Sequence, residues 1–516
     1  MHVVFRESHG LEDSETPFDP GQTPADLVVL SFSDSDLGAF AAGWHRGGGP
    51  DGKLPTLRLC NLVALRHPAS VDNYVEQTLS GAKGILIRLI GGENYWPYGI
   101  MQVQDFARRN GIALAVLPAD GREDPALDAH STLPVSTLRR LSHLCDAGGA
   151  VAAQAALAQL ALAAGFYAGP VPGSKTVPDC GIYDPDQGVM PLSDMAGDVV
   201  AVTFYRSYLT AADTAPIDAL INALRERGFA AVGIFVPSLK APSGRAFLDQ
   251  TLARINPVAI INATAFSGRG EDGKTPLDAP GCPVFQVALS TARQRDWAKA
   301  ERGLSPAVVS FKAPEKKDPY LQFSRFAHRA NADRIQAVVD RVAGWHRLAR
   351  TPTQNRKLAL VLSTYPGRAD QIAHAVGLDA LTSTEDMLLT LATAGYSVEP
   401  AIGFGKALAE DTISWSAADY ASHLASLPDG LVQDVLTAWG PVDDDPLFRG
   451  GAFHFPAQVC GNAVIALQPE RGAIAARDTD YHDLARIPRH SYVAFYLWLR
   501  AQGMHALVHI GAHGTL

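Results

Sequence analysis

The chain has 516 residues, of which 47% are hydrophobic and 19% charged, as is typical of a globular protein with roughly three or four domains. Its formal net charge of -9 argues against a nucleic-acid or anionic-membrane partner, because both require a basic surface. Five scattered cysteines form no C-x-x-C pair and the N-terminus lacks a secretory apolar segment, which predicts a cytoplasmic protein.

The first block, residues 1–125, alternates short apolar runs with amphipathic stretches. This alternation is typical of βαβ units and predicts a Rossmann-like or flavodoxin-like α/β domain. Ser70 begins a plausible helix cap, and Gly111 is a plausible helix stop. The expected strands span 26–32, 57–63, 84–90 and 112–117, and the expected helices span 34–44, 70–80 and 98–110.

A loop of two glycines and three aromatic residues, 91–98, follows the third expected strand. Ligands of doubly wound sheets bind beyond the carboxyl ends of the strands. Tyr95, Trp96 and Tyr98 could therefore present flat surfaces to a planar ligand. Aromatic rings also pack loops that bridge two domains, so the residues alone leave both interpretations open.

Residues 126–175 are predicted to form a helical connector that ends in a Pro/Gly-rich break. Within it, 147–170 carries no charge and is long enough to span a bilayer. It is rich in alanine and glycine and contains Gln154 and Gln159, so its transfer into lipid gains little free energy. We therefore expect a core helix and no membrane partner.

The α/β pattern then restarts three times, which predicts several successive Rossmann/flavodoxin-like parallel-sheet units. The expected units are a second α/β domain at 176–330, a third at 331–440 and a final one at 441–516. The second contains expected strands at 199–205, 230–236, 258–263 and 284–288, with helices at 215–227 and 243–255. The later units contain a helix at 332–348, strands at 357–362 and 463–467, a helix at 491–500 and a terminal strand with Val508 and Ile510.

Residues 268–275 match the phosphate-binding pattern G-x-x-x-x-G-K-[ST] and follow an expected strand. A phosphate-binding loop of this type must open a helix, whose terminal amides hold the phosphates. Three prolines and a glycine follow instead, between 276 and 283. We therefore predict a charged loop and no nucleotide-binding residues, with an NTPase that uses Lys274 as a minor alternative.

Histidines gather near the end of the chain, at His454, His482, His490, His505, His509 and His513. Neutral imidazole suits Co, Ni, Fe and Zn. Two glycines near His513 let the backbone approach a ligand closely, which makes His513 the favoured metal ligand. Any other single histidine is more commonly a surface or core residue. The acidic run 443–445 is explained more simply as an exposed turn than as a cation site.

Motifs at 461–472, 481–482, 488–492, 495–500 and 508–516 together resemble the large subunit of the aerobic cobaltochelatases (CobN type). The same order of motifs, in weaker form, marks the large subunit of magnesium chelatase. Further stretches resemble the cobalt branch specifically, namely 21–26, 30–37, 88–92, 213–218, 236–240 and 262–266. In the family the last motif continues into a glutamate, a Trp-Leu-Pro-Gly-Lys segment and a long C-terminal half, and the step near Ala307 is longer.

The resemblance implies an ATP-dependent ligase that inserts Co(II) into hydrogenobyrinic acid a,c-diamide during cobalamin biosynthesis. Two smaller subunits forming an AAA+ motor would use Mg-ATP, and the unit at 441–516 would begin the chelatase core. His513 would hold the metal or remove protons, with His509 as a second metal ligand. Asn462, Gln468 and His490 would contact the substrate.

Two alternatives remain beside cobalt insertion. One is a magnesium chelatase large subunit acting on protoporphyrin IX, and the other is a non-catalytic tetrapyrrole-binding protein. Because the terminal strand ends at Leu516 without a covering element, we expect an N-terminal fragment of a longer protein that is inactive by itself.

Overall fold

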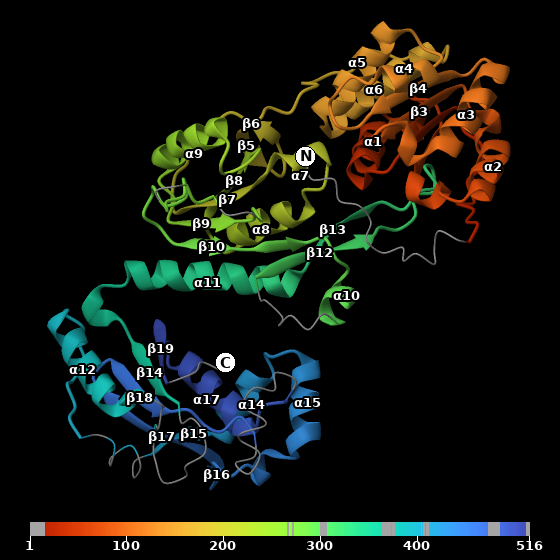
Figure 1. Cartoon of the computed structure of the whole chain (residues 1–516). Helices are drawn as coiled ribbons and strands as arrows, with labels where there is room; N and C mark the ends of the chain where they lie inside the picture. The colour runs from red at the N-terminus through yellow and green to blue at the C-terminus, as the bar shows by residue number, and fades with distance from the viewer. Residues whose placement is uncertain are drawn as a thin grey trace. The chain divides into compact units, whose positions relative to one another are not determined.

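The computed structural model describes residues 16–265, 268–270, 273–299, 307–363, 373, 377–403, 405, 408, 412–472 and 486–511. The chain forms two compact units, Met1–Val342 and Ala343–Leu516 (Figure 1). Parallel strands alternate with helices in both units, so the predicted fold class is confirmed. The domain boundaries inside these units stay predictions.

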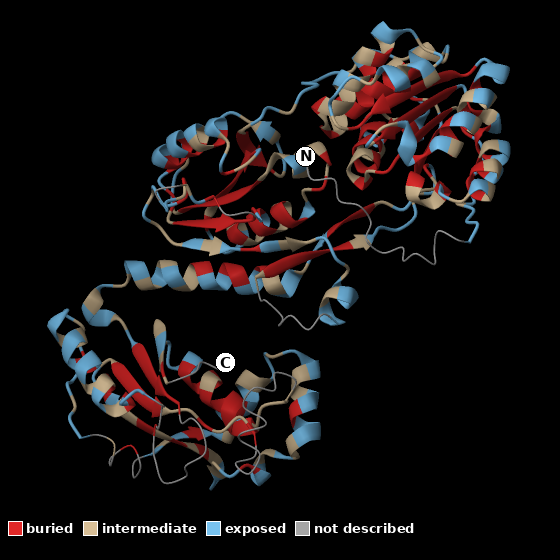
Figure 2. Cartoon of the chain, viewed as in Figure 1, coloured by how far each residue is buried: buried red, intermediate tan, exposed pale blue. Residues whose placement is uncertain are grey.

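The first sheet is fully parallel, in the order β2-β1-β3-β4, and every residue of its strands is buried (Figure 2). Helices cover both faces, which is why these strands are apolar runs without alternation. α2 and α3 pack on one face, and α1, α5 and α6 on the other. The strands are Leu27–Ser31 (β1), Leu57–Asn61 (β2), Gly84–Leu89 (β3) and Ala113–Pro118 (β4), and the helices are Asp34–Arg46 (α1), Pro68–Gln77 (α2), Pro97–Asn110 (α3), Pro125–His130 (α4), Val135–Ala147 (α5) and Gly149–Ala163 (α6).

The uncharged helix α6 packs in the core of this domain, as predicted. It lies so close to α1 that a Cβ added to Gly43 would meet the Gln154 backbone nitrogen at 2.6 Å. The predicted connector helices α5 and α6 thus pack against the first sheet rather than standing apart from it. Within the described residues, no helix has the length and apolarity that a membrane crossing requires.

The two predicted helix signals in this domain had different outcomes. Gly111 ends α3 in the left-handed conformation, with φ of 64°, as predicted. The cap prediction at Ser70 was wrong, because α2 begins at Pro68 and His67 is the N-cap. The His67 Nδ1 accepts from the Ala69 backbone nitrogen at 3.1 Å, a role in which sequence patterns favour Ser, Thr, Asp or Asn.

The second sheet has the order β10-β9-β7-β8-β5-β6. Its parallel strands follow the predictions closely, whereas the antiparallel hairpin β5-β6 was not predicted. β6 is short and only partly buried, so it leaves no apolar run in the sequence. The elements are Gly181–Asp184 (β5), Gly188–Met190 (β6), Val199–Tyr205 (β7), Arg206–Thr210 (α7), Ala215–Glu226 (α8), Ala230–Val236 (β8), Pro242–Ile255 (α9), Ala259–Asn262 (β9) and Val284–Gln286 (β10).

A small third sheet, β11-β12-β13, completes the first unit. The loop between β12 and β13 returns to the first domain, where the side chain of Leu321 enters the core. There Arg58 Nη1 donates to the Tyr320 carbonyl at 2.7 Å. These segments lie more than 250 residues apart in sequence. The elements are Ala288–Ser290 (β11), Gln294–Lys299 (α10), Val308–Pro314 (β12), Phe326–Ala330 (β13) and Ala332–Arg350 (α11).

The C-terminal unit contains the mixed sheet β15-β17-β18-β14-β19, with β16 paired to β17. β18, β14 and β19 are parallel, whereas β15 and β17 are antiparallel additions that were not predicted. The aromatic helix α17 packs on one face of the sheet. The elements are Leu358–Leu362 (β14), Ala380–Thr393 (α12), Thr412–Ser416 (β15), Ala417–Leu424 (α14), Asp429–Trp439 (α15), Phe448–Arg449 (β16), Ala452–Cys460 (β17), Ala463–Leu467 (β18), His490–Ala501 (α17) and Ala506–Ile510 (β19).

Candidate functional site

The candidate site is the edge of the C-terminal sheet where the parallel strands β14, β18 and β19 end. β14 lies between the other two, with Leu362 opposite both Leu467 and Ile510. The strands therefore end level with one another, and Ser363, Gln468 and His509 lie at the same edge. The carboxyl edge of a parallel sheet is the ordinary ligand-binding edge of α/β folds.

Two buried polar atoms at this edge have no hydrogen-bond partner in the described part of the chain. They are Ser363 Oγ, in a residue only 2% exposed, and His509 Nε2. His509 pairs with Val361, whose side chain belongs to the core beneath α17, so alternation places the imidazole on the α17 face. Buried polar groups are ordinarily satisfied, and an unsatisfied pair on neighbouring strands indicates a site that takes its partner from outside.

The electrostatics of His509 favour a metal ligand. Burial lowers its pKa below the usual histidine value, because the charged imidazolium loses solvation. A neutral ring keeps a nitrogen lone pair available at neutral pH, which is the form that binds metal ions. No cluster of three or more His, Cys, Asp or Glu side chains suited to a metal occurs among the described residues. His509 is therefore a candidate for a single nitrogen contact to a metal ion.

Gln468 lies at this edge and is hydrogen-bonded to α17. Its Nε2 donates to the hydroxyls of Tyr492 at 3.0 Å and Tyr496 at 2.7 Å. These tyrosines are one helical turn apart, and their ring centroids lie 5.2 Å apart. Burial, reinforced by the neighbouring Tyr492, raises the pKa of Tyr496, so its hydroxyl keeps its proton. The amide of Gln468 is therefore held in a fixed orientation.

The other two predicted substrate contacts, Asn462 and His490, form hydrogen bonds within the protein. Asn462 precedes β18 and so lies at the opposite, amino edge, where its Nδ2 donates to the Gln354 carbonyl at 2.8 Å. His490 is buried at the start of α17, with Nδ1 bonded to the Tyr420 hydroxyl at 2.8 Å. Its Nε2 lies 3.0 Å from the Gly440 carbonyl, so both ring nitrogens are occupied inside the protein.

His513 and His482 lie outside the described residues. The remaining histidines of the group are separate from the edge or bonded elsewhere. His454 Nδ1 lies 3.1 Å from Ser414 Oγ on β15. His505 Nδ1 accepts from the Lys357 backbone nitrogen at 2.9 Å, at the amino end of β19.

Sequence reasoning missed Ser363 and misplaced part of the acidic run. Ser363 follows a predicted strand directly, which is the one signal that could have identified it.

In the acidic run, Asp443 and Asp444 are exposed as expected, but Asp445 is buried. Its Oδ2 accepts from the Ser491 backbone nitrogen at 2.9 Å in the first turn of α17. A carboxylate there satisfies a free helix amide and opposes the positive end of the helix dipole.

In the described part of the chain, the side-chain hydrogen bonds of Trp96 and Tyr98 in the aromatic loop 91–98 lie within its own domain. Trp96 is buried, and its Nε1 donates to the Leu65 carbonyl at 2.8 Å. The Tyr98 hydroxyl donates to Asp72 at 2.8 Å. Tyr95 is 58% exposed, Tyr98 is partly exposed and Trp96 is buried, so the three rings do not form one flat surface.

The phosphate-loop pattern is not followed by a helix, as predicted. The described residues 273–290 form turns and the short strands β10 and β11. Gly273 donates back to the Gly270 carbonyl at 3.1 Å, and Gly270 donates to the Lys274 carbonyl at 2.9 Å. The backbone amides of Gly270 and Gly273 are therefore used within the loop.

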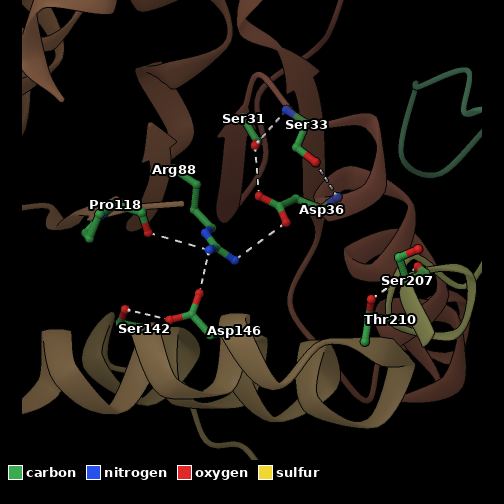
Figure 3. A network of polar contacts seen from close by, with 9 residues as sticks. All are labelled: Ser31, Ser33, Asp36, Arg88, Pro118, Ser142, Asp146, Ser207 and Thr210. Carbon is green, nitrogen blue, oxygen red and sulfur yellow. Dashed lines mark hydrogen bonds and ion pairs between the residues drawn. The ribbon is translucent and has the colours of Figure 1, made fainter. Parts of the chain in front are cut away.

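The corresponding edge of the first sheet carries a buried charge network (Figure 3). Arg88, in β3, donates from Nη2 to Asp146 of α5 at 2.8 Å, and its Nη1 lies 3.5 Å from Asp36 of α1. Ser31 Oγ donates to Asp36 at 3.0 Å and accepts from the Ser33 amide. Burial alone would lower the pKa of Arg88, but the two carboxylates outweigh it and raise the pKa. Arg88 Nε alone is buried without a partner among the described residues.

Comparisons with known proteins bear on both units. A family model described as CobN/Magnesium Chelatase matches residues 146–516. The chain is 32% identical to the aerobic cobaltochelatase subunit CobN of a Sinorhizobium species, over 100% of this chain and 44% of that protein. The corresponding protein of Pseudomonas aeruginosa is 31% identical, with the same shares. A magnesium-chelatase subunit from Cereibacter sphaeroides is 24% identical, over 66% of this chain and 33% of that protein.

A solved structure shares the fold. The catalytic subunit of cobaltochelatase from Mycobacterium tuberculosis superimposes with a TM-score of 0.72 at 24% identity, covering 95% of this chain and 43% of that chain. The chain therefore spans less than half the length of the relatives that it matches.

Proposed function

Because this chain belongs to the CobN/magnesium chelatase family, we propose that it acts as part of the large subunit of a cobaltochelatase. The enzyme would insert Co(II) into hydrogenobyrinic acid a,c-diamide, a step of cobalamin biosynthesis. The choice of cobalt rests on the share of this chain that aligns with each group of relatives. Two cobaltochelatase relatives align over 100% of this chain, whereas two bacterial magnesium-chelatase relatives align over 66%.

The chemistry of the C-terminal edge supports this proposal. Metal insertion requires removal of water from the ion, removal of protons from the ring nitrogens and transient presentation of the metal to the macrocycle. Within the part of the chain that the structure describes, His509 Nε2 and the Ser363 hydroxyl on the adjacent strand have no partner, and burial lowers the pKa of His509, which favours its neutral form. A site that must release its metal needs few ligands, because a full coordination shell would retain the ion. His513 would supply the second imidazole or the base.

ATP use belongs to partner subunits in this proposal. Two smaller subunits forming an AAA+ motor would hydrolyse Mg-ATP and drive the large subunit. The loop at Gly268 is consistent with this division, because the amides of Gly270 and Gly273 bond within the loop and no helix follows it in the described residues 273–290. Gln468, held by Tyr492 and Tyr496, would shape the wall that faces the substrate.

The test is replacement of His513 or His509 by Ala in the full-length large subunit assembled with its partners. We expect each variant to lower Co(II) insertion by about a hundredfold or more, with tetrapyrrole affinity changed by less than about threefold. Insertion is followed by the absorbance change of the macrocycle and affinity by fluorescence quenching. His505→Ala is the matched control, because His505 lies at the other end of β19 with its Nδ1 occupied.

Unchanged insertion in both variants would remove these histidines from the mechanism. The same assay distinguishes the alternatives. Insertion of Mg(II) into protoporphyrin IX in preference to Co(II) would assign the chain to the magnesium branch. Tetrapyrrole binding without insertion of either metal, with partners and ATP present, would indicate a binding protein.

A further inference from the structure

The hairpin β12-β13 in the first unit carries a cluster of polar side chains that the proposed chelatase chemistry does not use. Lys312 pairs with His328, Ser310 with Ala330 and Pro314 with Phe326. Because alternate residues share a face, Ser310, Lys312, Phe326 and His328 lie on the same face of the hairpin. The opposite face carries Phe311. Its ring centroid lies 5.4 Å from the ring centroid of Trp297 in α10 and 5.5 Å from Arg334 Cζ.

Two cations share the ring of Phe326 on this face. Lys312 Nζ lies 5.9 Å from the ring centroid, and Arg293 Cζ lies 5.6 Å from it. The Lys312 backbone nitrogen donates to the Ala292 carbonyl at 3.1 Å, which places Arg293 beside β12. Lys312 is only 4% exposed, yet within the described residues neither cation has a carboxylate partner. Lys312 is buried and Arg293 is half-buried, and cations withdrawn from water without a counter-charge favour a nearby anion.

Three buried polar atoms around these cations also lack partners within the described residues. They are Arg293 Nε, Ser310 Oγ and His328 Nε2. The other nitrogen of His328, Nδ1, lies 2.7 Å from Asp213 Oδ2, and the His328 amide donates to Asp213 Oδ1 at 3.0 Å. Asp213 is therefore occupied, and Arg325 lies 4.0 Å from it. With Nδ1 engaged by Asp213, Nε2 is the His328 ring nitrogen left for a ligand.

We propose that Arg293, Ser310, Lys312 and His328 form a binding site for a phosphate group. The two cations and the Ser310 hydroxyl donate to phosphate oxygens, and the remaining P–OH donates to His328 Nε2. Lys312 and His328 are directly opposite on the paired strands, where side chains are about 5 Å apart, a spacing that a tetrahedral oxyanion bridges. Sulfate has no such proton at neutral pH, and chloride cannot bond four groups in these directions. The site lies in the unit Met1–Val342, whereas the carboxyl edge of β14, β18 and β19 belongs to the unit Ala343–Leu516.

The experiment is isothermal titration of the full 516-residue chain with inorganic phosphate, sulfate and chloride at matched ionic strength. Glycerol 3-phosphate is titrated in parallel, to separate the free ion from a phosphomonoester. Lys312→Gln is expected to weaken phosphate binding by about tenfold to a hundredfold, since a charge-assisted hydrogen bond is lost. Lys316→Gln is the matched control, because Lys316 is an exposed lysine just beyond β12.

Arg293→Gln is the second variant, and its half-buried position lets the substitution be made without emptying the core. It is expected to weaken phosphate binding by at least about tenfold. Phosphate binding that exceeds sulfate binding and falls in both variants supports the proposal, with or without binding of glycerol 3-phosphate. Phosphate affinity weaker than about 10 mM in the unmodified chain overturns it. Equal loss in Lys312→Gln and Lys316→Gln also overturns it, since surface charge alone would then be responsible.

Discussion

The carboxyl edges of the first and the C-terminal sheets occupy the same position in their folds but differ in how many of their polar groups are paired. At the first edge, Ser31 and the terminal nitrogens of Arg88 are bonded to side chains of α1 and α5. At the second edge, Ser363 and His509 keep buried atoms unpaired among the described residues. Parallel topology offers a ligand-binding edge in both units. The two edges share a topology, so they are distinguished by how many of their buried polar side chains have hydrogen-bond partners among the described residues.

The largest expected effect comes from breaking the paired edge. Arg88→Met would leave Asp36 and Asp146 without their shared cation in a largely buried setting. We expect a loss of about 3 kcal/mol in the free energy of unfolding, because removing one partner of a buried pair leaves uncompensated charge. Urea unfolding monitored by circular dichroism measures it.

Arg109→Ala is the control for this change, since Arg109 pairs with Asp105 on the surface of α3. Exposed pairs contribute little, so its unfolding curve should overlay that of the unmodified chain. Equal stability of the Arg88 and Arg109 variants would contradict a structural role for the buried network.

An intermediate effect is expected from a second paired group of the first unit, Asp213. Burial alone would raise its pKa, but the hydrogen bonds from the His328 ring and amide, together with the positive charge of Arg325, outweigh burial and lower it. The stability that ionised Asp213 gives the folded state is therefore fully present above the pKa of an unfolded aspartate, about 3.9. It is lost as the pH falls from there through the lower pKa of the folded state. Asp213→Asn should cost about 2 kcal/mol at pH 7 and progressively less below about pH 4. Unfolding measured between these pH values tests the sign, and a difference that grows on acidification would contradict it.

The smallest effect sharpens the comparison with two matched serines. Ser31→Ala removes a paired, buried hydroxyl and should lower stability by about 1 kcal/mol. Ser363→Ala removes an unpaired one and should leave stability unchanged or raise it by up to about 1 kcal/mol. Thermal unfolding of the two variants under identical conditions gives the comparison. A loss in Ser363→Ala as large as that in Ser31→Ala would show that the second edge is also closed by internal bonds.

Much of the fold could be predicted because apolar runs are local signals. The strands at Val199–Tyr205, Ala230–Val236 and Ala463–Leu467 have the bounds that the sequence suggested. The hairpin strand β6 and the antiparallel β15 escaped prediction, since both are only partly buried and carry no continuous apolar run. His67 escaped as a cap because its ring nitrogen does what a serine or aspartate oxygen ordinarily does.

The candidate site was predicted only in part. His509 and Gln468 lie at the same edge, as residues of a common site must. Asn462 lies at the opposite end of β18 from Gln468. Both ring nitrogens of His490 are hydrogen-bonded, one to the Tyr420 hydroxyl and the other to the Gly440 carbonyl. Position along a strand sets which edge a residue reaches, but five residues of strand are enough to exchange one edge for the other.

The sequence by itself determined the alternation of strands and helices, the helix stop at Gly111 and the family, because each depends on residues that are neighbours along the chain. The tertiary structure alone decided which polar groups are satisfied. Arg88 meets a carboxylate 58 residues away, whereas His509 meets none among the described residues. Hydrogen bonds and ion pairs depend on distance in space, which a linear pattern of residues does not record.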